Sequence, residues 1–164
     1  MLHRPRSSGG GTARLVDALL DAGHLNLTVL DSSSVALERA KARLGERAAQ
    51  VTWIVGDVTA WRPPGPFDVW HDRAVFHFLV EPAARKRYIS VMRAALAPGA
   101  QAIFGTFASD GPERCSGLPV QRWEPAGLAA ELGSGFRLVE GLHEDHLTPS
   151  GNTQRFQFSR FARL

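Results

Sequence analysis

Apolar and polar positions along the chain predict helices and strands that alternate. Apolar residues recur at helical spacing in four segments, residues 12–23, 35–44, 81–99 and 125–132. Short runs rich in β-branched and aromatic residues predict strands at 25–31, 51–57, 67–73, 100–107, 136–142 and 153–161. Strands separated by helices of about 10–15 residues indicate βαβ units and a mostly parallel sheet. The last two strands are joined only by the polar turn TPSGN, so they are expected to pair antiparallel.

Length and composition favour one globular domain over residues 1–164, with no linker long enough to divide it. Apolar residues make up 44% of the chain and charged residues 21%, a balance typical of folded domains. The single Cys115 excludes an intrachain disulfide. No apolar run is long enough to span a membrane, and the basic N-terminus lacks the apolar core of a signal peptide. We therefore expect a cytoplasmic monomer that does not bind membranes.

Charge does not indicate a nucleic-acid partner. The net charge is only +3, although the pI is about 9.7, and the arginines are scattered along the chain instead of clustered. We therefore expect no nucleic-acid partner.

A glycine run and two strand-end carboxylates predict a nucleotide-type site. Gly9, Gly10 and Gly11 precede the first helix, and Asp31 lies 20 residues beyond Gly11 at the end of a strand. Asp57 ends the next strand. In open α/β sheets the ligand binds outside the carboxyl ends of the strands, where these residues would meet.

Two common nucleotide chemistries lack their residues. A dinucleotide motif needs Gly or Ala where this chain has Arg14, and the only tyrosine, Tyr88, is followed four residues later by Met92 and not by lysine. No Gly-Lys-Ser/Thr sequence occurs either. Hydride transfer and phosphoryl transfer are therefore both disfavoured.

Five segments in order resemble the class I S-adenosylmethionine-dependent methyltransferases: GGGTARLVDALLDAG, TVLDSS, WIVGDVTAW, FDVWHDRAVFHFL and LAPGAQAIFGTF. The resemblance covers about residues 9–164. It implies a Rossmann-like, mostly parallel sheet with a C-terminal antiparallel strand pair, and S-adenosyl-L-methionine as cofactor. The cofactor-binding residues it implies are the glycines for the methionyl part, Asp31 with Ser32 for the ribose, Asp57 for the adenine amino group, and the Val58 backbone: Gly9, Gly10, Gly11, Asp31, Ser32, Asp57 and Val58.

Residues 1–8, MLHRPRSS, depart from this family. A central parallel strand is buried on both faces and should be nearly continuously apolar, and Pro5 removes a ladder donor. We therefore expect the first strand to be degenerate or missing, either because the chain begins late or because the sheet lacks its centre. The expected consequences are marginal stability and weak cofactor binding. The alternative function is a non-catalytic, truncated interaction domain that no longer binds cofactor.

The methyl acceptor is not specified by the sequence, and N, O and S nucleophiles on small molecules or protein side chains all stay open. His71 and Asp72, at the end of the third predicted strand, are candidates for orienting or deprotonating the acceptor, although His71 can equally be a packing residue. Residues 109–123 are expected to cover the acceptor pocket. His143-Glu144-Asp145-His146 would alternate across a strand, so we expect no metal site there.

Overall fold

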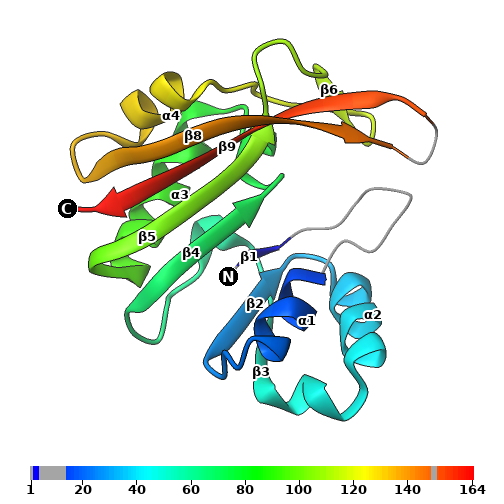
Figure 1. The fold of residues 1–164 in the computed structure, drawn as a ribbon. Coiled ribbons are helices and arrows are strands. Elements are labelled where there is room, and N and C mark those ends of the chain that lie inside the picture. Colours follow the sequence, from blue (N-terminus) through cyan, green and yellow to red (C-terminus); the bar gives the residue numbers. More distant parts are fainter. Residues whose placement is uncertain (1, 4–13, 149–150) are drawn as a thin grey trace.

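A seven-stranded sheet forms the middle of the molecule (Figure 1). The computed structural model describes residues 2–3, 14–148 and 151–164. The strand order is β3-β2-β1-β4-β5-β9-β8; β1 to β5 pair in parallel, whereas β9 pairs antiparallel with both β5 and β8. The bounds are β1 Leu2–His3, β2 Leu27–Asp31, β3 Val51–Val55, β4 Phe67–Arg73, β5 Leu96–Phe107, β8 Phe136–Leu147 and β9 Thr153–Arg163. The predicted Rossmann-like sheet with a C-terminal antiparallel pair is confirmed.

Helices cover both faces of the sheet. Neighbouring residues of a strand point to opposite faces, so a strand with apolar residues in succession has apolar side chains to bury on each face. In β2, Val29 packs in one apolar cluster with Val16 and Leu37, whereas Leu30 belongs to a second, larger cluster. The first cluster lies under α1 and α2, and the second under α3 and α4. The helix bounds are α1 Arg14–Asp21, α2 Ser34–Leu44, α3 Pro82–Ala95 and α4 Pro125–Leu132, with short 3-10 helices η1 Gly45–Gln50, η2 Val58–Ala60 and η3 Phe76–Phe78. Within the described part of the chain, no helix has the length and apolarity that crossing a membrane requires.

The centre of the sheet holds a strand of two residues. Leu2 pairs with Leu30 of β2 and with Asp72 of β4, and His3 pairs with Arg73. A first strand is therefore present at these two residues, and the expectation that the sheet lacks its centre is wrong there. Ladder hydrogen bonds need only an extended backbone, so an apolar sequence is not required for so short a strand. Pro5 and the rest of residues 4–13 lie outside the described residues.

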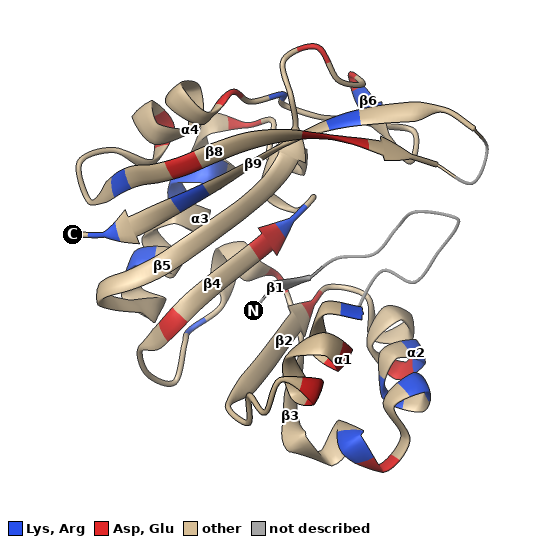
Figure 2. Ribbon diagram, viewed as in Figure 1, with Lys and Arg blue, Asp and Glu red and all other residues tan. Residues whose placement is uncertain are grey.

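The first two helices are joined by ion pairs on their outer surface. Arg43 Nη2 lies 2.9 Å from Asp17 Oδ2, and Arg47 Nη2 lies 2.7 Å from Asp21 Oδ1. Figure 2 shows the acidic residues on α1 and the basic ones on α2 and the segment after it. The hydrogen bond from Arg43 lowers the pKa of Asp17. Because these pairs are exposed, each adds at most about 1 kcal/mol, and apolar burial of Val16 and Leu20 beneath them holds α1 in place.

Several predicted boundaries differ from the structure, and three of the differences change the description of the fold. The helix expected over 81–99 ends at Ala95, because β5 already begins at Leu96, which pairs with Phe67. The strand expected over 136–142 continues to Leu147, because long-range pairing with β9 extends it through polar residues. The irregular stretch 108–123 contains a small hairpin of β6 Arg114–Cys115 and β7 Leu118–Pro119.

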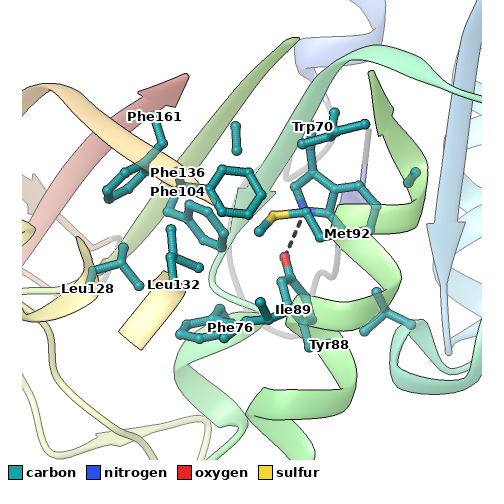
Figure 3. Close-up of a cluster of buried hydrophobic side chains, with 14 of the residues drawn as sticks. Trp70, Phe76, Tyr88, Ile89, Met92, Phe104, Leu128, Leu132, Phe136 and Phe161 are labelled. Carbon is teal, nitrogen blue, oxygen red and sulfur yellow. Dashed lines mark hydrogen bonds between the residues drawn. The ribbon is translucent and has the colours of Figure 1, made fainter. Parts of the chain in front are cut away.

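The larger apolar cluster surrounds a buried hydrogen-bond network (Figure 3). Trp70 Nε1 donates to the Tyr88 hydroxyl at 2.8 Å, and that hydroxyl donates to Asp72 Oδ2. Both rings meet edge to face, with centroids 5.7 Å apart. The two Asp72 oxygens also accept the backbone N–H groups of Val75 and Phe76. Tyr88 and Asp72 are both 0% exposed, so these bonds replace all contact with water.

Asp72 gives the stability of the fold a distinctive pH dependence. Burial raises the pKa of this carboxyl from 3.8 to about 6, against the opposing effect of the Tyr88 hydrogen bond. The folded protein therefore binds this proton more tightly than the unfolded chain, so the group favours folding below about pH 4 and that contribution is lost as the pH rises through 6. Two pKa units correspond to about 3 kcal/mol.

We predict that the free energy of unfolding of the wild type, relative to Asp72→Asn, falls by about 3 kcal/mol between pH 4 and 7. Urea unfolding of both proteins across this range measures it. Asp68→Asn, at the exposed start of β4, is the control and is expected to leave the wild-type profile unchanged. A difference between wild type and Asp72→Asn that does not vary with pH would contradict the prediction.

Candidate functional site

A pocket of about 330 Å3 opens at the carboxyl ends of β2 and β3. Its three walls are the ends of these strands, the segment that follows β4, and one side of α3. The lining residues are Leu30, Asp31, Ser32, Gly56, Asp57, Val58, Thr59, Val75, Phe78, Leu79, Ala84 and Arg87. Parallel strands bring their carboxyl ends to one edge of the sheet, so this is the edge where an open α/β fold binds its ligand.

Asp31 lines the pocket and is only 2% exposed. It is the last residue of β2, and its Oδ1 accepts the Ser33 N–H at 2.8 Å. Ser33 in turn caps α2 by accepting the Ala36 N–H at 3.2 Å. The Asp31 carbonyl accepts the Gly56 N–H at 3.0 Å, which holds the ends of β2 and β3 together. The carboxylate is therefore fixed in position before any ligand arrives.

Asp57 lies across the pocket on the turn after β3. Its Oδ1 accepts the Thr59 N–H at 2.8 Å and so begins η2, while the side chain stays exposed. Val58 is buried beneath it and contributes to the wall. Four of the seven residues implied as cofactor ligands thus meet in one pocket: Asp31, Ser32, Asp57 and Val58. Gly9, Gly10 and Gly11 lie outside the described residues.

Eight further lining residues were not identified from the sequence. Leu30, Gly56 and Thr59 adjoin the predicted ones along the chain, whereas the other five come from other segments. Val75, Phe78 and Leu79 follow β4, and Ala84 and Arg87 lie on α3. The sequence gives little indication of these five residues. The apolar run VFHFLV is typical of a protein core, and Arg87 is one of many arginines expected on the solvated surface. Only the fold places α3 beside the ends of β2 and β3.

The pocket suits a nucleoside. Its volume falls within the range of about 300–1,000 Å3 typical of small-molecule sites. Apolar side chains on the β4 and α3 walls face two carboxylates on the strand ends, an arrangement that combines an apolar surface for a base with acceptors for hydroxyl and amino groups. An adenosine-containing cofactor therefore fits the residues present.

Neither His71 nor Asp72 is among the residues that line this pocket. Asp72 is held entirely by Tyr88 and the backbone of Val75 and Phe76, on the face of the sheet that α3 covers. His71 points to the opposite face, and burial lowers its pKa to about 4, so its ring is neutral near pH 7. Within the described residues, His71 Nδ1 has no hydrogen-bond partner.

The other candidate groups are held by the fold. His77 is fully buried; its Nδ1 accepts the Phe107 N–H at 3.4 Å, and burial lowers its pKa to about 3. His143 Nε2 lies 3.0 Å from Glu124 Oε2 of the α4 N-terminus. Burial raises the pKa of the Cys115 thiol, which disfavours the reactive thiolate. Across residues 2–3, 14–148 and 151–164, no three His, Cys, Asp or Glu side chains converge as a metal site would require.

Known proteins similar to this chain are methyltransferases. Residues 7–99 match the family described as "Methyltransferase domain". A search of the curated proteins finds no match. Among solved structures, N-methyltransferase NodS from Bradyrhizobium japonicum WM9 aligns at TM-score 0.67 and 21% identity, over 84% of this chain and 73% of that chain.

Two further structures have the same fold. The 1,6-didemethyltoxoflavin-N1-methyltransferase of Burkholderia thailandensis, with bound 1,6-didemethyltoxoflavin and S-adenosylhomocysteine, aligns at TM-score 0.71 and 22% identity, over 95% of this chain and 68% of that chain. The glycopeptide N-methyltransferase MtfA, complexed with S-adenosylmethionine, aligns at TM-score 0.69 and 18% identity, over 93% of this chain and 78% of that chain. Because the family match spans more than half of the sequence, this chain belongs to the methyltransferase-domain family and is a class I S-adenosylmethionine-dependent methyltransferase.

Proposed function

We propose that this protein transfers the methyl group of S-adenosylmethionine to a nucleophilic nitrogen of a small-molecule or peptide acceptor. The observation that carries the proposal is the pocket that joins Asp31 and Asp57 at adjacent strand ends. The choice of nitrogen rests on the three similar structures named above, each of which is an N-methyltransferase. An oxygen or sulfur acceptor, or a protein side chain, is the competing outcome that an acceptor screen would reveal.

On the cofactor side, we assign the roles by the chemistry of each group. The fixed Asp31 carboxylate, with Ser32 beside it, accepts hydrogen bonds from the ribose hydroxyls. Asp57 accepts from the adenine amino group, and the Val58 backbone contacts the same ring. Gly9, Gly10 and Gly11 keep the role of a close backbone approach to the methionyl part.

On the acceptor side, the acceptor nitrogen has to be aligned with the methyl group, and a base has to take the proton that this nitrogen loses. The cofactor supplies a methyl group on a sulfonium, whose sulfur keeps the electron pair of the broken C–S bond as the acceptor nitrogen forms the new bond. Such a transfer depends mainly on proximity and orientation. We propose that His71 takes the proton that the nitrogen loses, because its Nδ1 has no partner among the described residues. Burial lowers the pKa of this ring to about 4, which keeps it neutral and also makes it a weak base. Asp72 contributes through the backbone that it holds.

The monomeric state, the cytoplasmic location and the lack of a nucleic-acid partner stay predictions. The direct test of the proposed function is isothermal titration of the protein with S-adenosylhomocysteine and, separately, with NAD. We expect binding of the first compound only. No binding of S-adenosylhomocysteine would instead support the non-catalytic interaction domain.

For Asp31, we predict that Asp31→Asn weakens S-adenosylhomocysteine binding by about 10- to 100-fold, because a charge-assisted contact worth about 1.5–3 kcal/mol is lost. Isothermal titration measures the change, and circular dichroism checks that the fold survives. The matched control is Asp68→Asn, because Asp68 is an exposed carboxylate near the start of β4, away from the carboxyl ends of the strands where the pocket lies. This variant should bind as the wild type does. Equal affinity of Asp31→Asn and wild type would remove Asp31 from the site.

For Asp57, the test combines a substitution in the protein, Asp57→Ala, with a ligand analogue that lacks the adenine amino group. We predict that the wild type discriminates by about tenfold or more against S-inosylhomocysteine, because the Asp57 carboxylate would then face a carbonyl oxygen where the adenine ring has an amino donor. Asp57→Ala should weaken S-adenosylhomocysteine binding and abolish this discrimination. If both proteins prefer the adenosine compound to the same extent, another residue recognises the amino group.

For residues 109–123, which contain the β6–β7 hairpin, we predict closure over bound ligand. The segment follows β5 on the ligand side of the sheet, and it is anchored where the Trp123 N–H meets the Phe107 carbonyl at 2.9 Å and the Gln121 N–H meets the His77 carbonyl at 2.7 Å. Hydrogen exchange of its amides should slow when S-adenosylhomocysteine binds. Identical protection with and without ligand would mean that the segment is only a connection.

A further inference from the structure

The turn after β4 forms one wall of the cofactor pocket in a backbone conformation that needs support. Ala74 has φ +60°, in the left-handed region that residues with a side chain rarely adopt, and its N–H donates to the Gly105 carbonyl at 2.8 Å. The residues that follow supply Val75, Phe78 and Leu79 to the pocket. The shape of this wall therefore depends on whatever holds the turn.

Asp72 holds the turn from below. Its Oδ1 accepts the Val75 N–H at 3.0 Å, and its Oδ2 accepts the Phe76 N–H at 3.1 Å. The carboxylate thus replaces the hydrogen bonds that the backbone would otherwise leave unmade at the start of η3. Asp72 and Phe76 are both 0% exposed, so no solvent molecule substitutes for the carboxylate at the Phe76 N–H if it is lost.

Tyr88 connects this turn to the opposite wall. Its hydroxyl donates to Asp72 Oδ2, and its neighbour Arg87 and the preceding Ala84 line the pocket from α3. Trp70 Nε1 fixes the direction of that hydroxyl by donating to it at 2.8 Å. One buried hydrogen bond therefore joins the two walls between which the pocket opens.

We propose that Asp72 and Tyr88 are a pair of positioning residues that set cofactor affinity by fixing the turn at 74–79 against α3. This inference rests on the proposed function, because it concerns the same pocket. Neither residue lines the pocket. Their effect passes through the backbone N–H groups of Val75 and Phe76.

The ionisation of Asp72 is coupled to this role. An ionised Asp72 carboxylate accepts hydrogen bonds from all three donors, the Tyr88 hydroxyl and the N–H groups of Val75 and Phe76. A protonated carboxyl carries an O–H group that itself needs an acceptor. The one titratable side chain that faces it within the described residues is Tyr88 of α3; the β5 residue opposite is Phe104, and the η3 residue is Phe76. With a pKa of about 6, about three quarters of the carboxyl is protonated at pH 5.5, so cofactor affinity should be about fourfold weaker there than at pH 7.5.

The experiment compares Asp72→Asn and Tyr88→Phe with a matched control, Thr106→Val. Thr106 is also buried, and its hydroxyl accepts from Gln157 Nε2 at 2.7 Å, so the control removes one hydroxyl from a buried network that does not line the pocket. Two measurements are made on each folded protein. The first is the Kd of S-adenosylhomocysteine at pH 5.5 and 7.5, and the second is hydrogen exchange of the Val75 and Phe76 amides without ligand.

We expect Tyr88→Phe and Asp72→Asn to weaken binding at pH 7.5 by about tenfold and to speed exchange of the two amides, because each removes buried hydrogen bonds. Asp72→Asn should also lose the pH dependence of the Kd that the wild type has. Thr106→Val should match the wild type in affinity, pH dependence and exchange of these amides. A merely structural role would lower stability in all three variants without this separation.

Several results would overturn the inference. These are unchanged affinity in Tyr88→Phe, a wild-type Kd that does not vary between the two pH values, and unchanged exchange of the Val75 and Phe76 amides in Asp72→Asn. If Asp72→Asn fails to fold, the affinity and the amide exchange of Tyr88→Phe test the inference without it. If the wild type does not bind S-adenosylhomocysteine, the proposed function fails, while the exchange measurement still decides whether Asp72 and Tyr88 hold the turn.

Discussion

A carboxylate buried in an apolar core has to find donors, and Asp72 finds all of its donors in elements that surround the pocket. The Tyr88 hydroxyl comes from α3, and the two backbone N–H groups come from the turn after β4. Burial of an ionised group without such partners would cost several kcal/mol, so the positions of β4, α3 and the turn are mutually constrained. The aromatic rings packed around this network, Phe76 and Phe104 among them, exclude the water that would relax that constraint.

The second constraint is the direction of the strands. Parallel pairing of β2 with β3 brings Asp31 and Asp57 to one edge, and the Gly56–Asp31 backbone bond keeps the two ends in register. Each carboxylate is also oriented by a local N–H, from Ser33 for one and Thr59 for the other. The pocket is therefore preorganised by ordinary turn and cap chemistry.

The part of the sheet beyond β4 is built differently. There the long β8–β9 hairpin adds to β5, and the Phe156 side chain of β9 contacts the Arg73 side chain at the end of β4. The Arg73 guanidinium lies 5.4 Å from the centroid of the Phe156 ring, and Phe158 covers Gly105 so closely that a Cβ there would lie 2.5 Å from its ring. These contacts fix the end of β4 from the side opposite to Tyr88. Methyl transfer needs this kind of alignment more than it needs a dedicated catalytic group.

Local patterns were sufficient to predict most elements and four of the twelve residues that line the pocket. The β-branched runs and the turns after them predicted that Asp31 and Asp57 lie where β2 and β3 end, although β3 itself ends at Val55, and the order of the elements predicted the parallel sheet. The length of β8 and the end of α3 were not predictable, because pairing with distant strands overrides local preference there.

The central strand is an element that forms although its sequence does not predict it. Its sequence is wrong for a buried strand, yet Leu2 and His3 pair with both neighbours because the ladder uses only the backbone. The sequence by itself determined which residues carry charge at the strand ends. Only the tertiary structure decided that Asp72 would be enclosed beneath the pocket and that Arg87 would line it, because the contacts that α3 makes with the strand ends join residues far apart in the chain.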